Sequence, residues 1–224
     1  MTFAQKYLGT DKKYLDYDFN LRKQRRNPEL NLKIARENIL LLKNIFNKNN
    51  IKFWLIYGTL LGAVRDKDFI KHDFDTDLGL FFSDINKLFD IKEQLEEKGF
   101  KLIRTKFPDD LITFMRKDEY IDLGFFSQKK TFFNNFWIYQ NNREKLKYFK
   151  SFDEINFLGE IFLVPNNHIN FIEEHYGKNW EIPIKNFPQL PNNFFGFKRR
   201  IKNLLGKSLI GKAIIHIYKN FFIF

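Results

Sequence analysis

FWLIYGTLLGAVRDKDFIKHDFDTDLGLFF, residues 53–82, is the segment from which the fold can be predicted. Its first five residues, 53–57, are apolar and have the length and composition of a short buried strand. Gly58-Thr59 then turns the chain into a short helix over about 59–66. A second apolar run predicts the next strand over 77–82. The segment therefore predicts two strands joined by a short helix and a polar loop.

Three aspartates, Asp73, Asp75 and Asp77, stand at alternate positions just before the second apolar run. Alternate residues of an extended chain point to the same face, so the three carboxylates should lie together. Their charges repel one another unless a positive group joins them, and a hard divalent cation with oxygen ligands is the usual solution. The spacing therefore predicts a metal site.

A fourth acid, Asp122, is set among apolar residues in the predicted strand 120–126, YIDLGFF. A buried lone carboxylate is costly, so it needs a cation, a base or a metal as its partner. An exposed acid on an edge strand is the alternative. If this strand lies beside that of Asp75 and Asp77, Asp122 can complete the site as a metal ligand or accept a proton.

Residues after the first strand could hold phosphate. Gly58 and Thr59 are small, so backbone N–H groups at the helix start could approach an anion closely, although Gly58 alone could be only a tight turn. The planar guanidinium of Arg65 suits bidentate phosphate contact. With one or two Mg²⁺ ions on Asp75 and Asp77, these parts suit metal-assisted transfer of a phosphorus group.

The remaining pattern predicts further helices and strands and places the chain in the α/β (α+β) class. Asn27 and Pro28 are typical of a helix start, and the apolar stripe that follows continues to about Asn47. The other predicted elements are a helix from Ser83-Asp84 to Lys98 closed by Gly99, strands at 100–106, 111–116 and 131–140, a hairpin at 155–164 turning at Leu158-Gly159, and a helix from Pro165 to Gly177.

Composition limits the function classes. A chain of 224 residues with 44% hydrophobic residues can bury a core, which excludes a disordered tail. It has no cysteine, which excludes disulfides, cysteine-ligated zinc and thiol catalysis. We find no secretory signal and no long uncharged apolar run, so we expect a cytoplasmic protein without a membrane-spanning helix.

The net charge of +11 is concentrated at one end, since residues 198–224 hold seven Lys or Arg and no acid. A nucleic-acid-binding protein would more often carry excess basic residues on its folded domain too, so no nucleic-acid partner is expected. The basic tail has apolar residues at helical spacing, which suits an amphipathic helix on anionic lipid at the inner face of the membrane. Docking on its own body or on a second subunit is equally compatible.

The segment 53–80 resembles the signature of the LicD/fukutin family, part of the nucleotidyltransferase-fold superfamily: a strand, GTLLGAVR, a Phe-Ile pair and aspartates ending in Asp-x-Asp. The similarity covers roughly 28–185 and includes the later segment FLVPNNHINFIEEHYGKNWEIP. Departures are Asp68 in place of the typical Gly, Lys71-His72 in place of Pro-Trp, and Phe74 within the aspartate run.

The resemblance implies a nucleotidyltransferase-like catalytic domain, with a mixed sheet flanked by helices, over 28–190 between an N-terminal arm, 1–27, and the basic tail, 191–224. Within it, Asp75 and Asp77 match the metal-binding pair and Asp122 is the candidate third carboxylate. Gly58 and Thr59 match the Gly-Ser/Thr element, and Mg²⁺ or Mn²⁺ is the expected cofactor.

The implied reaction transfers a substituted phosphate, such as phosphocholine or a polyol phosphate, from a CDP-linked donor to a hydroxyl of a cell-surface glycan or lipid-linked oligosaccharide. CMP would leave. An alternative is a nucleotidyltransferase that attaches a nucleoside monophosphate and releases pyrophosphate. A basic nucleic-acid-binding protein without catalysis is the third reading.

Overall fold

The structure is a computed structural model that describes residues 14–16, 29–106, 111–130, 135–139 and 142–183. The chain divides into two compact units, of which the first comprises 1–130 and 134–181. Every element named below belongs to this first unit. The predicted tail, and the predicted arm apart from 14–16, lie outside the described residues.

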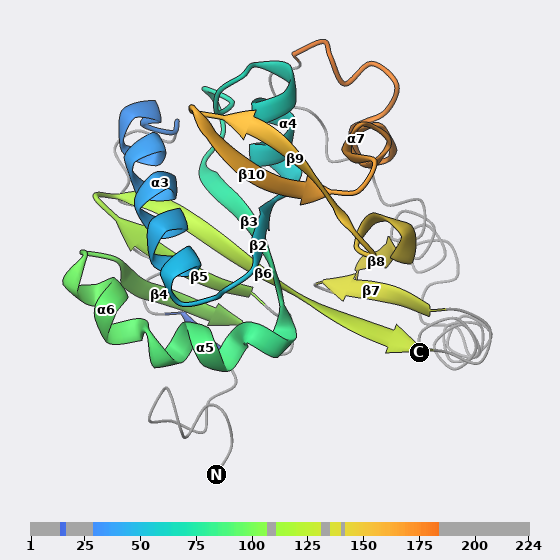
Figure 1. Ribbon diagram of the computed structural model, residues 1–224. Helices are drawn as coiled ribbons and strands as arrows, with labels where there is room; N and C mark the ends of the chain where they lie inside the picture. The colour runs from blue at the N-terminus through green and yellow to red at the C-terminus, as the bar shows by residue number, and fades with distance from the viewer. Residues whose placement is uncertain (1–13, 17–28, 107–110, 131–134, 140–141, 184–224) are drawn as a thin grey trace, which may run out of the picture. The chain divides into compact units, whose positions relative to one another are not determined.

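An eight-stranded mixed sheet forms the centre of the first unit (Figure 1). Its strands are β1 (Tyr14–Asp16), β2 (Phe53–Leu55), β3 (Asp75–Phe81), β4 (Lys101–Lys106), β5 (Leu111–Arg116), β6 (Glu119–Lys130), β7 (Asn135–Tyr139) and β8 (Asn142–Lys145). The order is β1-β4-β5-β6-β3-β2, and β7 and β8 extend from the second half of β6. Only the β3–β6 pair is parallel among the described pairs, so the predicted mixed sheet is confirmed.

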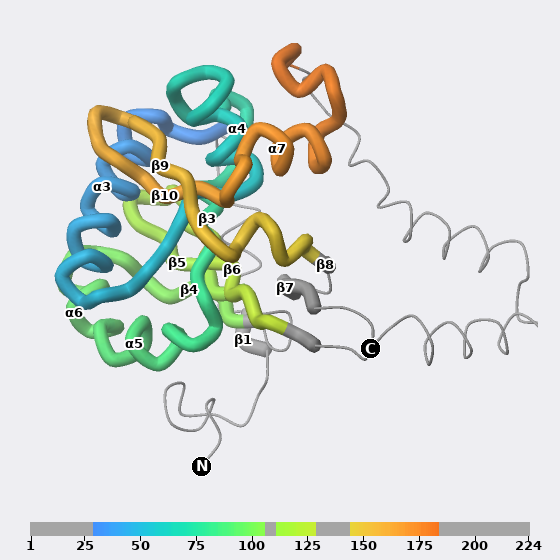
Figure 2. The backbone as a smooth tube through the Cα atoms, turned by 45° about the vertical axis from the view of Figure 1, so that its right-hand side comes forward, coloured from blue at the N-terminus to red at the C-terminus, as the bar shows by residue number. Residues whose placement is uncertain are grey.

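Helices flank this sheet, and a separate hairpin lies near β2. The helices are α3 (Leu32–Lys48), α4 (Tyr57–Arg65), α5 (Ile85–Asp90), α6 (Lys92–Glu97) and α7 (His168–Tyr176), with short 3-10 turns η1 (Phe82–Asp84) and η2 (Leu146–Tyr148). The hairpin consists of β9 (Phe152–Phe157) and β10 (Glu160–Pro165). Figures 1 and 2 show α4 and α7 near the start of β3 and α5 near its end, with α6 following α5 and contacting β4.

The core forms where apolar faces of these elements meet. Helix α3 buries Ala35, Ile39 and Leu42, which recur at the helical period and form one stripe toward the sheet. Trp54 on β2 is fully buried, and its indole fills the space beside Gly79 on β3. A Cβ at Gly79 would lie 2.2 Å from Trp54 Nε1, so only glycine fits there.

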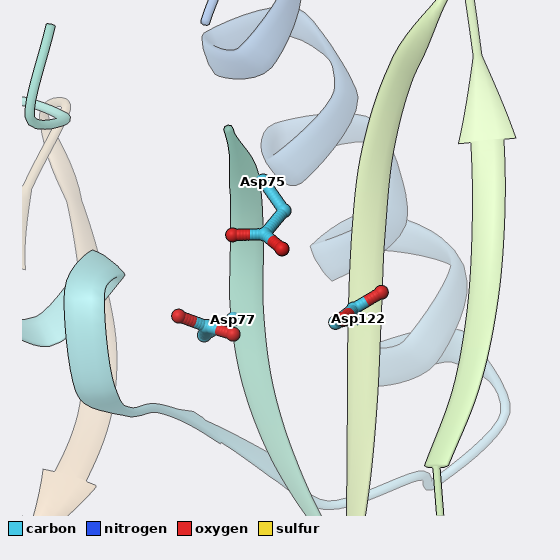
Figure 3. A group of neighbouring side chains, drawn as sticks. All are labelled: Asp75, Asp77 and Asp122. Atoms are coloured by element: carbon cyan, nitrogen blue, oxygen red, sulfur yellow. The ribbon is translucent and has the colours of Figure 1, made fainter. Parts of the chain in front are cut away.

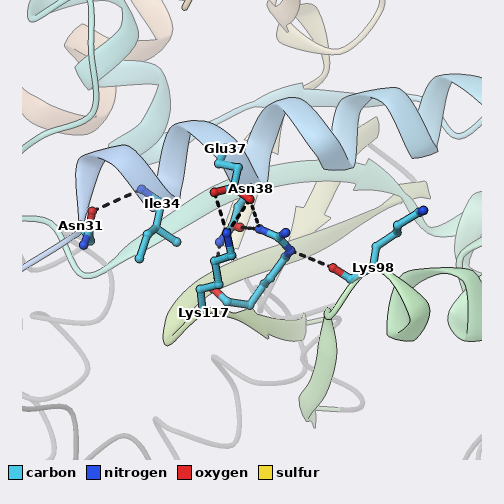
Figure 4. A network of polar contacts seen from close by, with 7 residues as sticks. Asn31, Ile34, Glu37, Asn38, Lys98 and Lys117 are labelled. Atoms are coloured by element: carbon cyan, nitrogen blue, oxygen red, sulfur yellow. Dashed lines mark hydrogen bonds and ion pairs between the residues drawn. The ribbon is translucent and has the colours of Figure 1, made fainter.

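A polar network fastens α3 to β5 (Figure 4). The buried Asn38 donates to the backbone carbonyl of Arg116 at 3.0 Å, and Arg116 Nη1 donates back to Asn38 Oδ1 at 2.8 Å. Arg116 also donates to Glu37 at 2.8 Å and to the carbonyl of Lys98 at 2.8 Å. These bonds satisfy polar groups that would otherwise be costly to bury.

Two predicted helix starts were wrong. Helix α3 begins at Leu32 after the N-cap Asn31, whose side chain accepts from the Ile34 N–H at 3.3 Å, and not after Asn27. Pro165 is the last residue of β10, and α7 begins only after Asn167, which has φ 54°. At α3 the cap hydrogen bond selects Asn31, whereas at α7 strand pairing keeps Pro165 in β10 and Asn167, in the left-handed region, makes no side-chain cap bond.

Other boundaries follow the prediction more closely. The hairpin turns at Leu158 and Gly159, which have φ values of 57° and 80°, and Gly99 and Gly177 follow helix ends with φ values of 85° and 86°. The helix predicted from Ser83-Asp84 to Lys98 is divided into α5 and α6 at Ile91. Of the strand predicted over 131–140, the structure describes 135–139 as β7.

Candidate metal and phosphate site

The structure brings Asp75, Asp77 and Asp122 together (Figure 3). Asp75 and Asp77 lie two residues apart on β3, and Asp122 is the direct register partner of Asp77 on the parallel strand β6. One oxygen of each carboxylate can be chosen so that all three lie within 4.8 Å of one another. Because β6 lies between β3 and β5, the alternative of an exposed edge-strand acid is wrong for Asp122.

The electrostatics of the cluster favour a cation. Burial raises the pKa of Asp77 well above its usual range, and the charges of Asp75, Asp73 and Asp122 raise it further. One hydrogen bond, from the Gly58 N–H at 3.2 Å, opposes this rise. Carboxylate oxygens are the ligands that Mg²⁺ and Mn²⁺ prefer, so the three residues fit such an ion.

Asp73 lies beside the cluster, where Gly58 approaches both its carboxylate and that of Asp77. A Cβ added to Gly58 would lie 2.4 Å from Asp73 Oδ2 and 3.3 Å from Asp77 Oδ2, so a glycine is needed for this approach. Burial raises the pKa of Asp73, opposed by a hydrogen bond from the Phe74 N–H at 2.9 Å and by the nearby His72. Asp73 is not among the three residues whose ligand atoms converge.

Gly58 and Thr59 lie in the first turn of α4 and connect it to β3. Gly58 donates its N–H to the Asp77 carboxylate, and the hydroxyl of Thr59 accepts from the Asp77 N–H at 2.8 Å. Thr59 is buried. The two residues thus position Asp77 in the structure, and their contact with phosphate stays a prediction.

Arg65, at the other end of α4, contacts its neighbour Asp66. Its Nε and Nη2 each donate to one Asp66 oxygen at 2.8 Å, and its side chain is 10% exposed. Its charge also opposes the rise in the pKa of Tyr176 that burial, Asp77 and Asp73 cause. Tyr176 therefore lies near the acidic cluster and near Arg65, at the end of α7.

Sequence reasoning missed two residues that hold Asp122. Arg104 on β4 and Thr113 on β5 both donate hydrogen bonds to its carboxylate. Both are polar residues inside predicted strands, which is the only local signal they offer. Their proximity to Asp122 depends on strand order and register, which no local pattern reports.

A second buried polar group joins α4 to α7. Tyr57 begins α4 with φ 46°, and its hydroxyl donates to the buried Glu144 at 3.1 Å. His175 Nε2 lies 3.1 Å from the same Glu144 oxygen, and its ring stacks on Phe171 with centroids 4.1 Å apart. Burial lowers the pKa of His175, but the hydrogen bond and charge of Glu144, the Phe171 carbonyl and the charge of Glu174 together raise it, so the net direction is upward.

Comparison with known proteins agrees with this geometry. The model of the LicD/FKTN/FKRP nucleotidyltransferase domain matches residues 50–167, more than half of the chain. The chain is 32% identical over 160 residues to "Ribitol-5-phosphate transferase FKTN" of Homo sapiens, covering 68% of this chain and 34% of that protein. It is 25% identical over 184 residues to "Ribitol 5-phosphate transferase FKRP" of Homo sapiens, covering 77% and 36%.

The chain thus spans about a third of the length of these relatives. Among solved structures it is similar to the lincosamide antibiotic adenylyltransferase LnuA, with a TM-score of 0.43 and 11% identity over 60% of this chain and 82% of that one. The signature segment, the convergent carboxylates and the match over 50–167 agree, and the chain belongs to the LicD/FKTN/FKRP family.

Proposed function

We propose that this chain is a metal-dependent transferase that moves a substituted phosphate from a CDP-linked donor to a hydroxyl of a glycan and releases CMP. The observation that carries the proposal is the convergence of Asp75, Asp77 and Asp122, with ligand atoms within 4.8 Å, inside a domain of this family. Partly buried carboxylates at this spacing repel one another and are costly without a cation, which supports a catalytic use.

The proposed roles follow from the contacts. Asp75, Asp77 and Asp122 would hold Mg²⁺ or Mn²⁺, which when bound would polarise phosphoryl oxygens and neutralise negative charge on the donor. Gly58 fixes one oxygen of Asp77 through its N–H, and Thr59 fixes the Asp77 backbone. A phosphate contact of Gly58, Thr59 or Arg65 is part of the proposal. For Arg65 it requires the guanidinium to share or leave Asp66.

The proposed reaction is a single nucleophilic substitution at the distal phosphorus of the donor. The oxygen of the acceptor hydroxyl bonds to the distal phosphorus of the donor, and the bond from that phosphorus to the oxygen of CMP breaks. The hydroxyl proton is released to water. The products are CMP and a phosphodiester on the glycan.

The relatives favour a polyol phosphate as the first group to test, because FKTN and FKRP are named as ribitol-5-phosphate transferases. Phosphocholine is the second. The acceptor is proposed as a cell-surface glycan, such as lipopolysaccharide or capsule, or its lipid-linked precursor.

Product analysis tests the proposal. The full chain would be incubated with Mg²⁺ or Mn²⁺, glycan acceptors and, in separate reactions, CDP-ribitol, CDP-choline, CTP and ATP. CMP release that needs the acceptor and stops with a chelator supports the proposal. Pyrophosphate release from CTP or ATP, with a nucleoside monophosphate on the acceptor, would instead identify a nucleotidyltransferase. Chelator-resistant CMP release would overturn the metal dependence.

We also propose that the protein works in the cytoplasm, with its basic segment 198–224 on the inner face of the membrane. Its seven Lys or Arg and no acid support attraction to anionic lipid. In the part of the chain that the structure describes, no helix is long and apolar enough to cross a bilayer. Co-sedimentation with phosphatidylglycerol vesicles should be lost when 198–224 is deleted, and unchanged binding would exclude this role.

A further inference from the structure

Four neighbouring strands place four polar side chains in one row across the sheet. Arg104 on β4 is the register partner of Thr113 on β5, and Thr113 is the partner of Asp122 on β6. Asp122 is in turn the partner of Asp77 on β3. Directly opposed residues in neighbouring strands project to the same face. The row therefore connects a permanent positive charge to the acidic cluster.

The hydrogen bonds along this row all run toward Asp122, with Arg104 and Thr113 as donors. Arg104 Nη2 donates to both oxygens of Asp122, at 3.1 and 2.8 Å, and Arg104 Nε donates to the Thr113 hydroxyl at 2.9 Å. The Thr113 hydroxyl, having accepted from Arg104, donates its own proton to Asp122 Oδ1 at 2.6 Å. One side chain orients the next, so the hydroxyl has no freedom to rotate.

Burial makes these contacts more consequential than surface ion pairs. Thr113 is 2% exposed, and the side chains of Arg104 and Asp122 are 18% and 12% exposed. The carboxylate of Asp122 receives three hydrogen bonds, and an ionised carboxylate has about four acceptor positions. The row thus fixes the rotation of Asp122 and leaves acceptor capacity for one more bond.

We propose that Arg104 and Thr113 are positioning residues that hold the Asp122 carboxylate in the orientation in which it binds a divalent metal with Asp75 and Asp77. This inference rests on the proposed function. Neither residue needs to touch the metal or the substrate. Hydrogen-bond partners of metal-binding carboxylates commonly set the affinity of such sites.

Charge and geometry make opposite predictions for Arg104, which allows them to be separated. If Arg104 only balanced the negative charge of the acidic cluster, removing its charge would relieve repulsion of the metal ion and strengthen metal binding. If Arg104 positions Asp122, replacing its two-pronged guanidinium weakens metal binding even when the positive charge is kept. A lysine keeps the charge, but it cannot reproduce the planar, rigid fork of the guanidinium.

The test is calorimetric titration of the full chain with Mn²⁺ and with Mg²⁺, without substrate, for the wild type, Arg104→Lys, Arg104→Met, Thr113→Val and Thr113→Ser. We expect Arg104→Lys, Arg104→Met and Thr113→Val each to weaken binding about 10- to 100-fold. Thr113→Ser retains the hydroxyl and should bind within about twofold of wild type. Melting curves of the metal-free variants identify any that do not fold.

Arg116→Lys is the matched control, since Arg116 also uses a fork, on β5, but contacts Glu37, Asn38 and Lys98. It should bind metal like the wild type. Wild-type affinity in both Arg104→Lys and Thr113→Val, or tighter binding by Arg104→Met, would overturn the positioning role while leaving the metal site intact. A wild-type chain that binds neither ion would instead overturn the metal-dependent function, and this role with it.

Discussion

Asp77 and Asp122 are direct register partners on β3 and β6, the parallel pair at the centre of the sheet. They are 45 positions apart in the sequence, yet their carboxylate oxygens lie close enough to bind the same metal ion. The pairing arises because the chain between them forms α5, α6, β4 and β5 and returns to the sheet beside β3. The site is therefore a property of sheet topology as much as of its residues.

Asp77→Asn should stabilise the metal-free fold and abolish metal binding. Burial and three neighbouring carboxylates raise the pKa of Asp77, so the ionised form is disfavoured in the folded state. A raised carboxyl pKa costs stability above the folded-state value, and this cost disappears as the pH falls toward about 3.9, the usual unfolded value. Urea unfolding of both proteins with a chelator should therefore show the larger difference at pH 7.5 and almost none near pH 4.

The same variant should lose CMP release. Metal stabilisation of phosphoryl charge is worth several kcal/mol, and about 1.4 kcal/mol is a factor of ten in rate, so a fall of about a hundredfold or more is expected. Asp90→Asn, a carboxylate at the end of α5 outside the three-aspartate group, serves as the control and should retain activity. Near-wild-type turnover by Asp77→Asn would contradict the assigned site.

Gly58→Ala should destabilise the protein by about 1–3 kcal/mol, because the new Cβ would lie 2.4 Å from the Asp73 carboxylate. Denaturant unfolding measures the loss, and metal titration should show weaker binding, because the Gly58 N–H positions Asp77. The cost should shrink in an Asp73→Ala background, where the contact is removed. An equal cost in both backgrounds would show that Asp73 is not the obstacle.

Gly79→Ala serves as a comparison for Gly58→Ala, because it introduces a similar clash in the hydrophobic core and not at the acidic cluster. Its Cβ would lie 2.2 Å from the buried indole of Trp54, so a loss of about 1–3 kcal/mol is again expected. In this case the clash lies between β2 and β3 and not in a carboxylate contact, so the variant that remains folded at low temperature should bind Mn²⁺ with wild-type affinity. Weaker Mn²⁺ binding by the fully folded variant would show that the Trp54–Gly79 contact influences the acidic cluster.

The bond between His175 and Glu144 should make stability depend on pH. The pKa of His175 is raised in the folded state, so its contribution is complete below about pH 6.5, the usual unfolded value, and disappears as the pH rises through the folded-state value. The stability difference between wild type and His175→Gln should thus be larger at pH 6 than at pH 9. A difference that does not change with pH would show that His175 does not carry charge in this contact.

Several features of the fold could be predicted because the signal is local. Glycines at helix and hairpin ends, Gly99, Gly159 and Gly177, all have the positive φ that favours glycine. The predicted start of α3 was wrong because Asn27 and Asn31 are both plausible caps, and that of α7 was wrong because Pro165 pairs with Phe152 as the last residue of β10. The cap that forms at α3 depends on which backbone N–H each side chain can reach after packing.

The sequence alone determined the acid pair and its orientation, because the period of two in a strand places Asp75 and Asp77 on one face whatever the rest of the chain does. Family resemblance and the cost of burying a lone carboxylate made Asp122 a candidate for the same site. Only the tertiary structure decided that β6 pairs with β3 in the register that opposes Asp122 to Asp77, and that Arg104 and Thr113 continue the row. Strand order and register depend on long-range pairing across the whole sheet, and a local pattern carries no information about which strand becomes a neighbour.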